Sequence, residues 1–180
     1  MLLRAFGDTH ERSRKQAEDD HDHDGAAIVP PHFYRELTRT AEGCKLLREK
    51  GHFEEFAATI RDHGMETIDQ ELILKVKGCL WAVGNVGSME LGAPFIEETD
   101  VVENIVKIAE NHEIMTMRGT AFFVLGLISR SLHGSEILLE FGWDGATTIM
   151  GESLGFCLPT DLRRLFSVCS SAPNLISNEC

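Results

Sequence analysis

Residues Leu72–Ser88 read LILKVKGCLWAVGNVGS, and this stretch decides the fold of the chain. Its apolar residues return at steps of three and four, at Leu72, Val76, Leu80 and Val83. That period belongs to one face of an α-helix and not to the alternation of a strand. The stretch is therefore predicted to be a long amphipathic helix.

A second stretch repeats the first. Residues Met117–Ser129 read MRGTAFFVLGLIS, which keeps the order basic residue, Gly, small residue, aromatic residue, Val, Gly and aliphatic residue. Lys77 then corresponds to Arg118, about 41 positions later, a spacing typical of helical repeats. No alternation of period two extends beyond a few residues, so we predict an all-α chain.

A shorter motif also occurs three times. Each copy begins with Gly, has two large apolar residues at its fourth and fifth places, and has a turn or capping residue eight places after the Gly. The copies span 43–51, 92–100 and 134–142. Such a period is typical of armadillo and HEAT arrays, in which a unit cannot enclose its own apolar face and must stack on a neighbour. We therefore predict an armadillo/HEAT-like α-solenoid fragment of about three repeats, the third of which fades after Trp143.

The other helices are predicted from the same period and from capping residues. They span about 32–50 with a break near Gly43, 52–62, 91–98, 101–111, 114–131, 135–141, a weaker helix after Trp143, and 160–169. Thr67 or Asp69 is expected to cap the long helix, and Asp100 is expected to form a capping box with Glu103.

The ends of the chain lack the composition of a packed domain. Residues 1–27 are polar and charged and are predicted to be a disordered acidic tail, followed by the repeat domain over 28–176 and a flexible end over 177–180. His and Asp alternate within residues 19–24, which leaves a metal-dependent enzyme as an alternative. Charge runs are more often solvated, so we assign no metal ligand, no cofactor and no catalytic residue.

Composition disfavours several classes of function. The 180 residues include 17 Lys and Arg against 29 Asp and Glu, and a net charge of −12 disfavours binding to nucleic acid or to an anionic membrane. The longest apolar run, 121–128, is far shorter than the roughly 20 residues of a membrane span. The five cysteines form no C-x-x-C pair, which favours buried thiols in a reducing compartment and hence a cytoplasmic protein.

Two residues of the long helix resemble those that line the groove of peptide-binding armadillo repeats. There a Trp and an Asn four residues apart line the concave face, and the Asn binds the main chain of an extended ligand. Trp81 and Asn85 have this spacing, which places them on one helical face, whereas Phe122 and Gly126 stand at the equivalent positions of the second stretch. This resemblance implies a generic peptide-binding adaptor as one function.

Lys77 and Arg118 are further candidate contacts, because both lie near the start of a long helix at equivalent repeat positions. They are expected either to meet an acidic partner segment or simply to be solvated. The candidate partner-binding residues are thus Lys77, Trp81, Asn85 and Arg118.

A longer resemblance covers about residues 28–176. It is carried by IVPPHFY at 28–34, GCKLL at 43–47, LWAVGNVGS at 80–88, RGT at 118–120, VLGLI at 124–128, GWD at 142–144 and LPTD at 158–161. The series resembles the carboxyl-terminal part of the helical-repeat region of the Rictor, or Pianissimo, family. The resemblance implies a non-catalytic scaffold segment of TOR complex two, with the TOR kinase and the other subunits of that complex as partners. Exposed solenoid ends also lead us to expect self-association.

Overall fold

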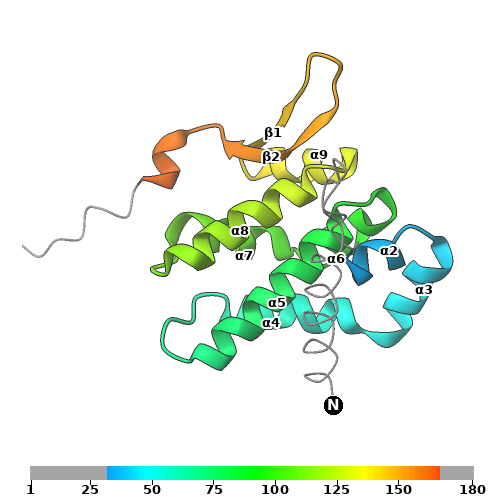
Figure 1. Cartoon of the computed structure of the whole chain (residues 1–180), viewed down its shortest axis with the longest axis horizontal. Coiled ribbons are helices and arrows are strands. Elements are labelled where there is room, and N and C mark those ends of the chain that lie inside the picture. Colours follow the sequence, from blue (N-terminus) through cyan, green and yellow to red (C-terminus); the bar gives the residue numbers. More distant parts are fainter. Residues whose placement is uncertain (1–31, 167–180) are drawn as a thin grey trace, which may run out of the picture. The chain divides into compact units, whose positions relative to one another are not determined.

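The computed structural model describes residues 32–166, and helices dominate that part of the chain (Figure 1). The helices are α2 (Phe33–Leu37), α3 (Ala41–Lys50), α4 (His52–His63), α5 (Gln70–Gly87), η1 (Glu90–Gly92), α6 (Ala93–Thr99), α7 (Val101–Asn111), α8 (Met115–Ile128), α9 (Leu132–Glu140) and η2 (Leu162–Leu165). The predicted α-solenoid fragment is confirmed. The tail over 1–27 and the end over 177–180 lie outside the described residues, so the domain boundaries stay a prediction.

The long helices of neighbouring repeats pack directly on each other. Helix α4 packs on α5, α7 packs on α8, and α5 and α8 run side by side between them (Figure 1). Leu80 and Val83 of α5 and Val124 of α8 are completely buried. A Cβ atom at Gly84 would lie 3.0 Å from the Val124 side chain, so the glycine allows the two helices to approach closely.

The leading glycine of each short motif makes the same contact in all three copies. A Cβ atom at Gly43, Gly92 or Gly134 would overlap a carbonyl oxygen of the preceding segment. These oxygens belong to Leu37, Val86 and Ile128, respectively. The repeat predicted from the sequence is therefore also a repeat of backbone geometry.

The turn residue of each motif has a left-handed backbone. Its φ is 65° at Gly51, 52° at Asp100 and 73° at Gly142. Asp100 makes no side-chain hydrogen bond to the start of α7, so the predicted capping box with Glu103 is wrong. A side chain in the left-handed region is strained, and Asp100 is the only non-glycine residue with positive φ among those described.

Replacing Asp100 with Gly is expected to raise the free energy of unfolding by about 0.5–1 kcal/mol. Glycine removes a backbone strain of roughly 1–2 kcal/mol. Part of this stabilisation is offset because glycine also increases the conformational entropy of the unfolded chain. Urea unfolding of Asp100→Gly beside the parent measures the difference. Asp62→Gly is the matched control, because Asp62 is exposed near the end of α4 and glycine there should destabilise a helix. A less stable Asp100→Gly protein contradicts the prediction.

Helix α5 begins as expected at one of the two predicted caps. The Asp69 Oδ1 atom accepts hydrogen bonds from the backbone N–H groups of Glu71 and Leu72, at 3.0 Å and 3.1 Å. Asp69, and not Thr67, is therefore the N-cap.

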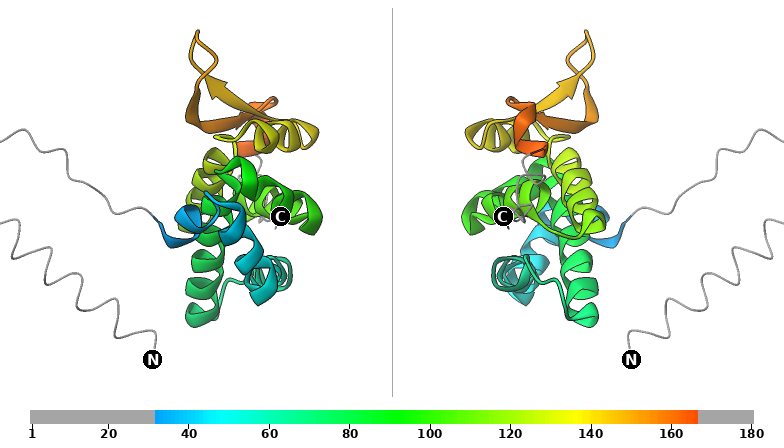
Figure 2. Two further views of the ribbon diagram at one scale, coloured as in Figure 1. Left: turned by 90° about the vertical axis from the view of Figure 1, so that its right-hand side faces the viewer. Right: turned by 90° about the vertical axis from the view of Figure 1, so that its left-hand side faces the viewer.

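The segment after Trp143 is not the weak helix that the sequence predicts. It forms an antiparallel hairpin of β1 (Trp143–Thr147) and β2 (Ser153–Pro159). The hairpin packs on α8 and α9, at the opposite end of the described part from α4 (Figures 1 and 2). The hairpin therefore covers part of α8 where the sequence predicts a further helix.

The last predicted helix, over 160–169, lies partly outside the described residues. Within the described residues it is the single 3₁₀ turn η2. The Asp161 Oδ1 atom caps this turn by accepting a hydrogen bond from the Arg163 backbone N–H at 3.0 Å.

The thiols of the described cysteines are free, as the sequence predicts. Cys79 and Cys157 are buried. Burial raises the pKa of both thiols, and it raises the pKa of Cys157 to about 12. These two cysteines therefore act as small apolar core residues.

Candidate protein-interaction site

Helices α5 and α8 present a shared exposed surface, which we call the α5/α8 face. It consists of Leu74, Lys77, Gly78 and Trp81 on α5 and of Met115, Thr116, Gly119 and Phe123 on α8. Its large apolar side chains are unusually exposed: 66% for Leu74, 40% for Trp81, 69% for Met115 and 50% for Phe123. A group of large exposed apolar side chains is typical of a surface that binds another molecule.

The two aromatic residues of the face contact each other across the helix pair. The ring centroids of Trp81 and Phe123 lie 5.1 Å apart, and the rings are tilted by 47°. Comparison of the two repeat stretches instead makes Phe122 the equivalent of Trp81. The Phe122 ring turns toward Trp143, with the ring centroids 6.0 Å apart. Sequence reasoning therefore missed Phe123. The signal was the four-residue spacing of Met115, Gly119 and Phe123, which defines one side of α8.

Asn85 lies one turn beyond Trp81 but is only 7% exposed. Its Nδ2 atom donates a hydrogen bond to the Trp81 carbonyl oxygen at 2.9 Å. The side-chain amide thus binds the main chain of its own helix. Recognition of a peptide through Asn85 stays a prediction.

The two predicted basic contacts occupy different environments. The Lys77 Nζ atom donates to the Thr116 Oγ1 atom at 2.9 Å, which links α5 to α8 on the exposed face. Arg118 points away from this face. Its Nε atom donates to the Ala109 carbonyl at 3.0 Å and its Nη2 atom donates to the Leu165 carbonyl at 2.7 Å. The structure therefore brings Lys77 and Trp81 together and separates Arg118 from them, and partner binding through these residues stays a prediction.

A buried histidine supports the turn that leads into α8. The His112 Nδ1 atom accepts a hydrogen bond from the Ile114 backbone N–H at 2.9 Å, so in the neutral ring Nε2 carries the proton and donates to the Glu66 carbonyl at 3.1 Å. Burial lowers the pKa of His112, and Lys77 acts in the same direction. The hydrogen bond to Glu66 and the charge of Glu113 oppose this shift. The neutral ring therefore fits the fold best.

Stability is expected to fall as the pH drops below 6.5, the ordinary pKa of histidine. The native pKa of His112 lies below that value, so the unfolded chain takes up the proton first. The contribution is thus present above pH 6.5 and is lost as the pH falls toward the native pKa. Urea unfolding between about pH 7.5 and 5.5 measures this loss.

His112→Gln is the variant that isolates the effect. It should be less stable than the parent at neutral pH but should lose less stability on acidification, because the titrating group is gone. Burial also lowers the pKa of His32, which both proteins retain. Equal pH dependence in the parent and in His112→Gln would exclude His112 as the source.

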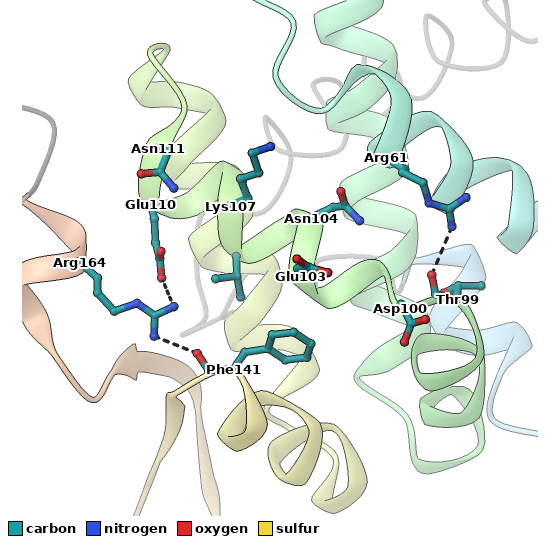
Figure 3. Close-up of a pocket in the computed structure, with 11 residues that line it drawn as sticks. Arg61, Thr99, Asp100, Glu103, Asn104, Lys107, Glu110, Asn111, Phe141 and Arg164 are labelled. Atoms are coloured by element: carbon teal, nitrogen blue, oxygen red, sulfur yellow. Dashed lines mark hydrogen bonds and ion pairs between the residues drawn. The ribbon is translucent and has the colours of Figure 1, made fainter.

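A concavity of about 620 Å³ lies along α7 (Figure 3). Its charged lining residues are Arg61, Lys107, Arg164, Asp100, Glu103 and Glu110. Arg164 pairs with Glu110 at 2.7 Å, and Arg61 donates to the Thr99 carbonyl at 3.3 Å. Because the six charges include three of each sign, this groove does not select an ionic ligand by its net charge.

Residues 32–166 contain neither a cluster of metal-binding side chains nor a membrane-spanning helix. No group of three or more His, Cys, Asp or Glu side chains in this part could hold a metal ion, and the His and Asp run within 19–24 lies outside it. None of the helices in this range combines the length and the apolar character needed to cross a bilayer.

Stacked helical units define the described part of the chain as a helical-repeat protein. Residues 74–144 match a family model described as "Rapamycin-insensitive companion of mTOR, domain 5". The chain is 43% identical over 140 residues to the target of rapamycin complex 2 subunit ste20 of Schizosaccharomyces pombe, covering 78% of the chain and 11% of that protein. The matched part of the chain therefore belongs to the Rictor and Pianissimo family, as its motifs predicted.

Two other relatives also match most of this chain with a small part of their own length. Identity is 39% over 144 residues to the target of rapamycin complex 2 subunit TSC11 of Saccharomyces cerevisiae, covering 77% of the chain and 10% of the relative. Identity is 33% over 149 residues to the rapamycin-insensitive companion of mTOR of Homo sapiens. This match covers 83% of the chain and 8% of the relative. The chain thus spans about a tenth of the length of these relatives. The family match begins in α5 and ends in β1, so it contains the whole of α8 and most of α5.

Proposed function

We propose that this chain is a non-catalytic, protein-binding segment of a Rictor-like subunit of TOR complex 2 that supports TOR kinase signalling in the cytoplasm. One observation carries the proposal: the family match over 74–144 contains the α5/α8 face. Two of the relatives are named as subunits of that complex. Exposed aromatic side chains on a rigid helix pair are suited to holding another protein, because they lose little entropy on binding.

Affinity purification of the tagged chain from its own cells tests this function. We expect mass spectrometry of a cytosolic extract to recover the TOR kinase and the other subunits of TOR complex 2. A second arm replaces the matching segment of a full-length relative with this chain and asks whether the complex still assembles. Recovery of chaperones alone, together with failure of the exchanged protein to assemble, contradicts the proposal.

A generic peptide-binding adaptor is the second candidate, and the exposed Trp81 ring against Phe123 favours it. Under this alternative the chain binds extended peptides but no subunit of the kinase complex. The two candidates therefore differ in the identity of the partners recovered from the extract.

A further inference from the structure

The hairpin of β1 and β2 carries a row of exposed apolar side chains. Leu154, Phe156 and Leu158 are all exposed, and along β2 they alternate with the buried Cys157 and Pro159. Because successive side chains of a strand point to opposite faces, the three exposed residues lie on the face of the hairpin that points away from the helices. We call this the outward face of the hairpin. A row of exposed apolar side chains is typical of a surface that binds another molecule.

The turn at the tip of the hairpin adds two more apolar side chains. Ile149 is fully exposed and Met150 is 85% exposed. Turns are ordinarily built from Gly, Pro, Asn, Asp and Ser, whose backbone and side-chain properties suit the turn itself. Side chains that remain in water on folding contribute no hydrophobic stabilisation to the chain. The fold therefore gives no reason for Ile and Met at these two positions.

Hydrogen bonds hold the tip in a defined shape. The Thr148 N–H donates to the Glu152 carbonyl at 2.8 Å, and the Gly151 N–H donates to the Thr148 carbonyl at 2.9 Å. The Glu152 N–H also donates to the Thr148 Oγ1 atom at 3.2 Å. The hairpin projects from the helices (Figures 1 and 2), so the tip presents Ile149 and Met150 at the end of an ordered protrusion. A preorganised group loses less entropy on binding than a flexible one.

The charge of the hairpin and of the surface beside it is negative. Residues 143–159 contain Asp144 and Glu152 but no Lys, Arg or His. A concavity of about 520 Å³ lies against the hairpin, and its charged lining residues are Glu90, Asp144, Glu152 and Arg130. Three carboxylates against one guanidinium favour a basic group at this position.

This charge decides which occupant fits the hairpin best. A second copy would place like charges opposite each other, which disfavours association. An anionic membrane attracts basic residues, which the hairpin lacks. A protein cleft with apolar walls and basic residues at its edge matches both the apolar tip and the acidic concavity.

We propose that the hairpin inserts into an apolar cleft, bordered by Lys or Arg, of a partner protein. Ile149 and Met150 enter the cleft, the outward face of the hairpin lies against its wall, and a basic side chain of the partner enters the acidic concavity. This inference goes beyond the proposed function, because the family match over 74–144 ends near the start of β1 and excludes the rest of the hairpin.

Site-specific photo-crosslinking of the full chain in its own cells tests the proposal. The probe is p-benzoylphenylalanine at position 150, and mass spectrometry identifies the crosslinked peptide. We expect an apolar segment of another protein with Lys or Arg beside the crosslinked position. Capture of a protein is not sufficient by itself. Replacing that Lys or Arg with Glu should weaken the crosslink, and Glu152→Lys in this chain should then restore it.

Three variants of the probe-bearing chain locate the contact. Ile149→Asp changes a fully exposed side chain, so it should fold normally. Glu152→Lys reverses a charge whose side chain makes no hydrogen bond or ion pair within the described residues. With the parent partner, each should lower the crosslink yield at least about tenfold. Ile68→Asp is the matched control, because Ile68 is 85% exposed between α4 and α5, and it should leave the yield unchanged. Circular dichroism verifies the fold of each variant.

Each contrary result identifies a different occupant or none. Crosslinks to another part of the same chain, to a second copy or to lipid overturn the proposal, and so does the absence of any crosslink. Equal yields in Ile149→Asp and Ile68→Asp, or no rescue by the exchange of charges, overturn it as well. If TOR complex 2 subunits are recovered by affinity purification but position 150 crosslinks no protein, only this inference fails. If the expected crosslink forms but those subunits are not recovered, the proposed function fails instead.

Discussion

Replacing Gly92 with Ala is expected to lower the free energy of unfolding by about 3 kcal/mol or more. A Cβ atom at this position would overlap the Val86 carbonyl oxygen and would lie 3.0 Å from the Val86 Cγ1 atom. The overlapping atom belongs to the backbone at the end of α5, so relief requires the turn between α5 and α6 to move. That turn determines the direction in which the chain enters α6 and thus the second repeat.

Urea and thermal unfolding of Gly92→Ala measure the effect, which should lower the Tm by about 10 °C for a domain of this size. Gly78→Ala is the matched control. It adds the same methyl group to a helix with nothing within 4 Å, so it should stabilise the chain by about 0.5–1 kcal/mol. A similar loss of stability in both variants would mean that the Gly92 contact is not the cause.

The repeat was predictable because its defining contacts depend on a residue type that the sequence displays. Gly43, Gly92 and Gly134 must be glycine where the main chain approaches closely. The left-handed residue of each motif is less visible, because Asp100 stands where the other copies have Gly51 and Gly142. Asp100 was predicted to be a helix cap because its side chain is acidic, and the backbone angle φ cannot be seen in a sequence.

The hairpin could not be predicted from periodicity. Leu154, Phe156 and Leu158 alternate over only five residues, too short a run to outweigh the helical pattern of the rest of the chain. The strands form because β2 packs on α8, with Gly126 allowing the Phe156 backbone to approach. That contact is tertiary, so it does not appear in any local pattern.

The candidate site was predictable in part. Trp81 was chosen for its spacing from Asn85, and Lys77 was chosen for its repeat equivalence to Arg118. Both Trp81 and Lys77 lie on the α5/α8 face. The choice between Phe122 and Phe123 depends on the rotation of α8 about its axis, which two adjacent aromatic residues do not reveal. Arg118 differs from its repeat equivalent Lys77 because η2, which comes later in the chain, supplies the Leu165 carbonyl.

Trp143 is expected to be the anchor of the terminal hairpin, and Trp143→Ala should lower the free energy of unfolding by about 3–5 kcal/mol. The side chain is completely buried and its ring packs at 6.0 Å from that of Phe122. Its Nε1 atom donates to the Glu110 Oε1 atom at 3.1 Å, and the same carboxylate pairs with Arg164. One residue thus joins the hairpin to α7 and α8.

Trp143→Phe divides the loss, because it keeps an aromatic ring in the core but removes the hydrogen bond and part of the indole volume. It should cost about 1–3 kcal/mol, since Glu110 keeps its pairing with Arg164. Urea unfolding gives both values, and hydrogen exchange of the β2 amides gives the local effect. Because the hairpin covers α8 at Gly126, releasing it in Trp143→Ala should expose apolar surface and promote aggregation that increases with concentration. Unchanged protection of β2 in Trp143→Ala would show that the strand is held by its own contact with α8, and the anchor would then have to be sought around Gly126.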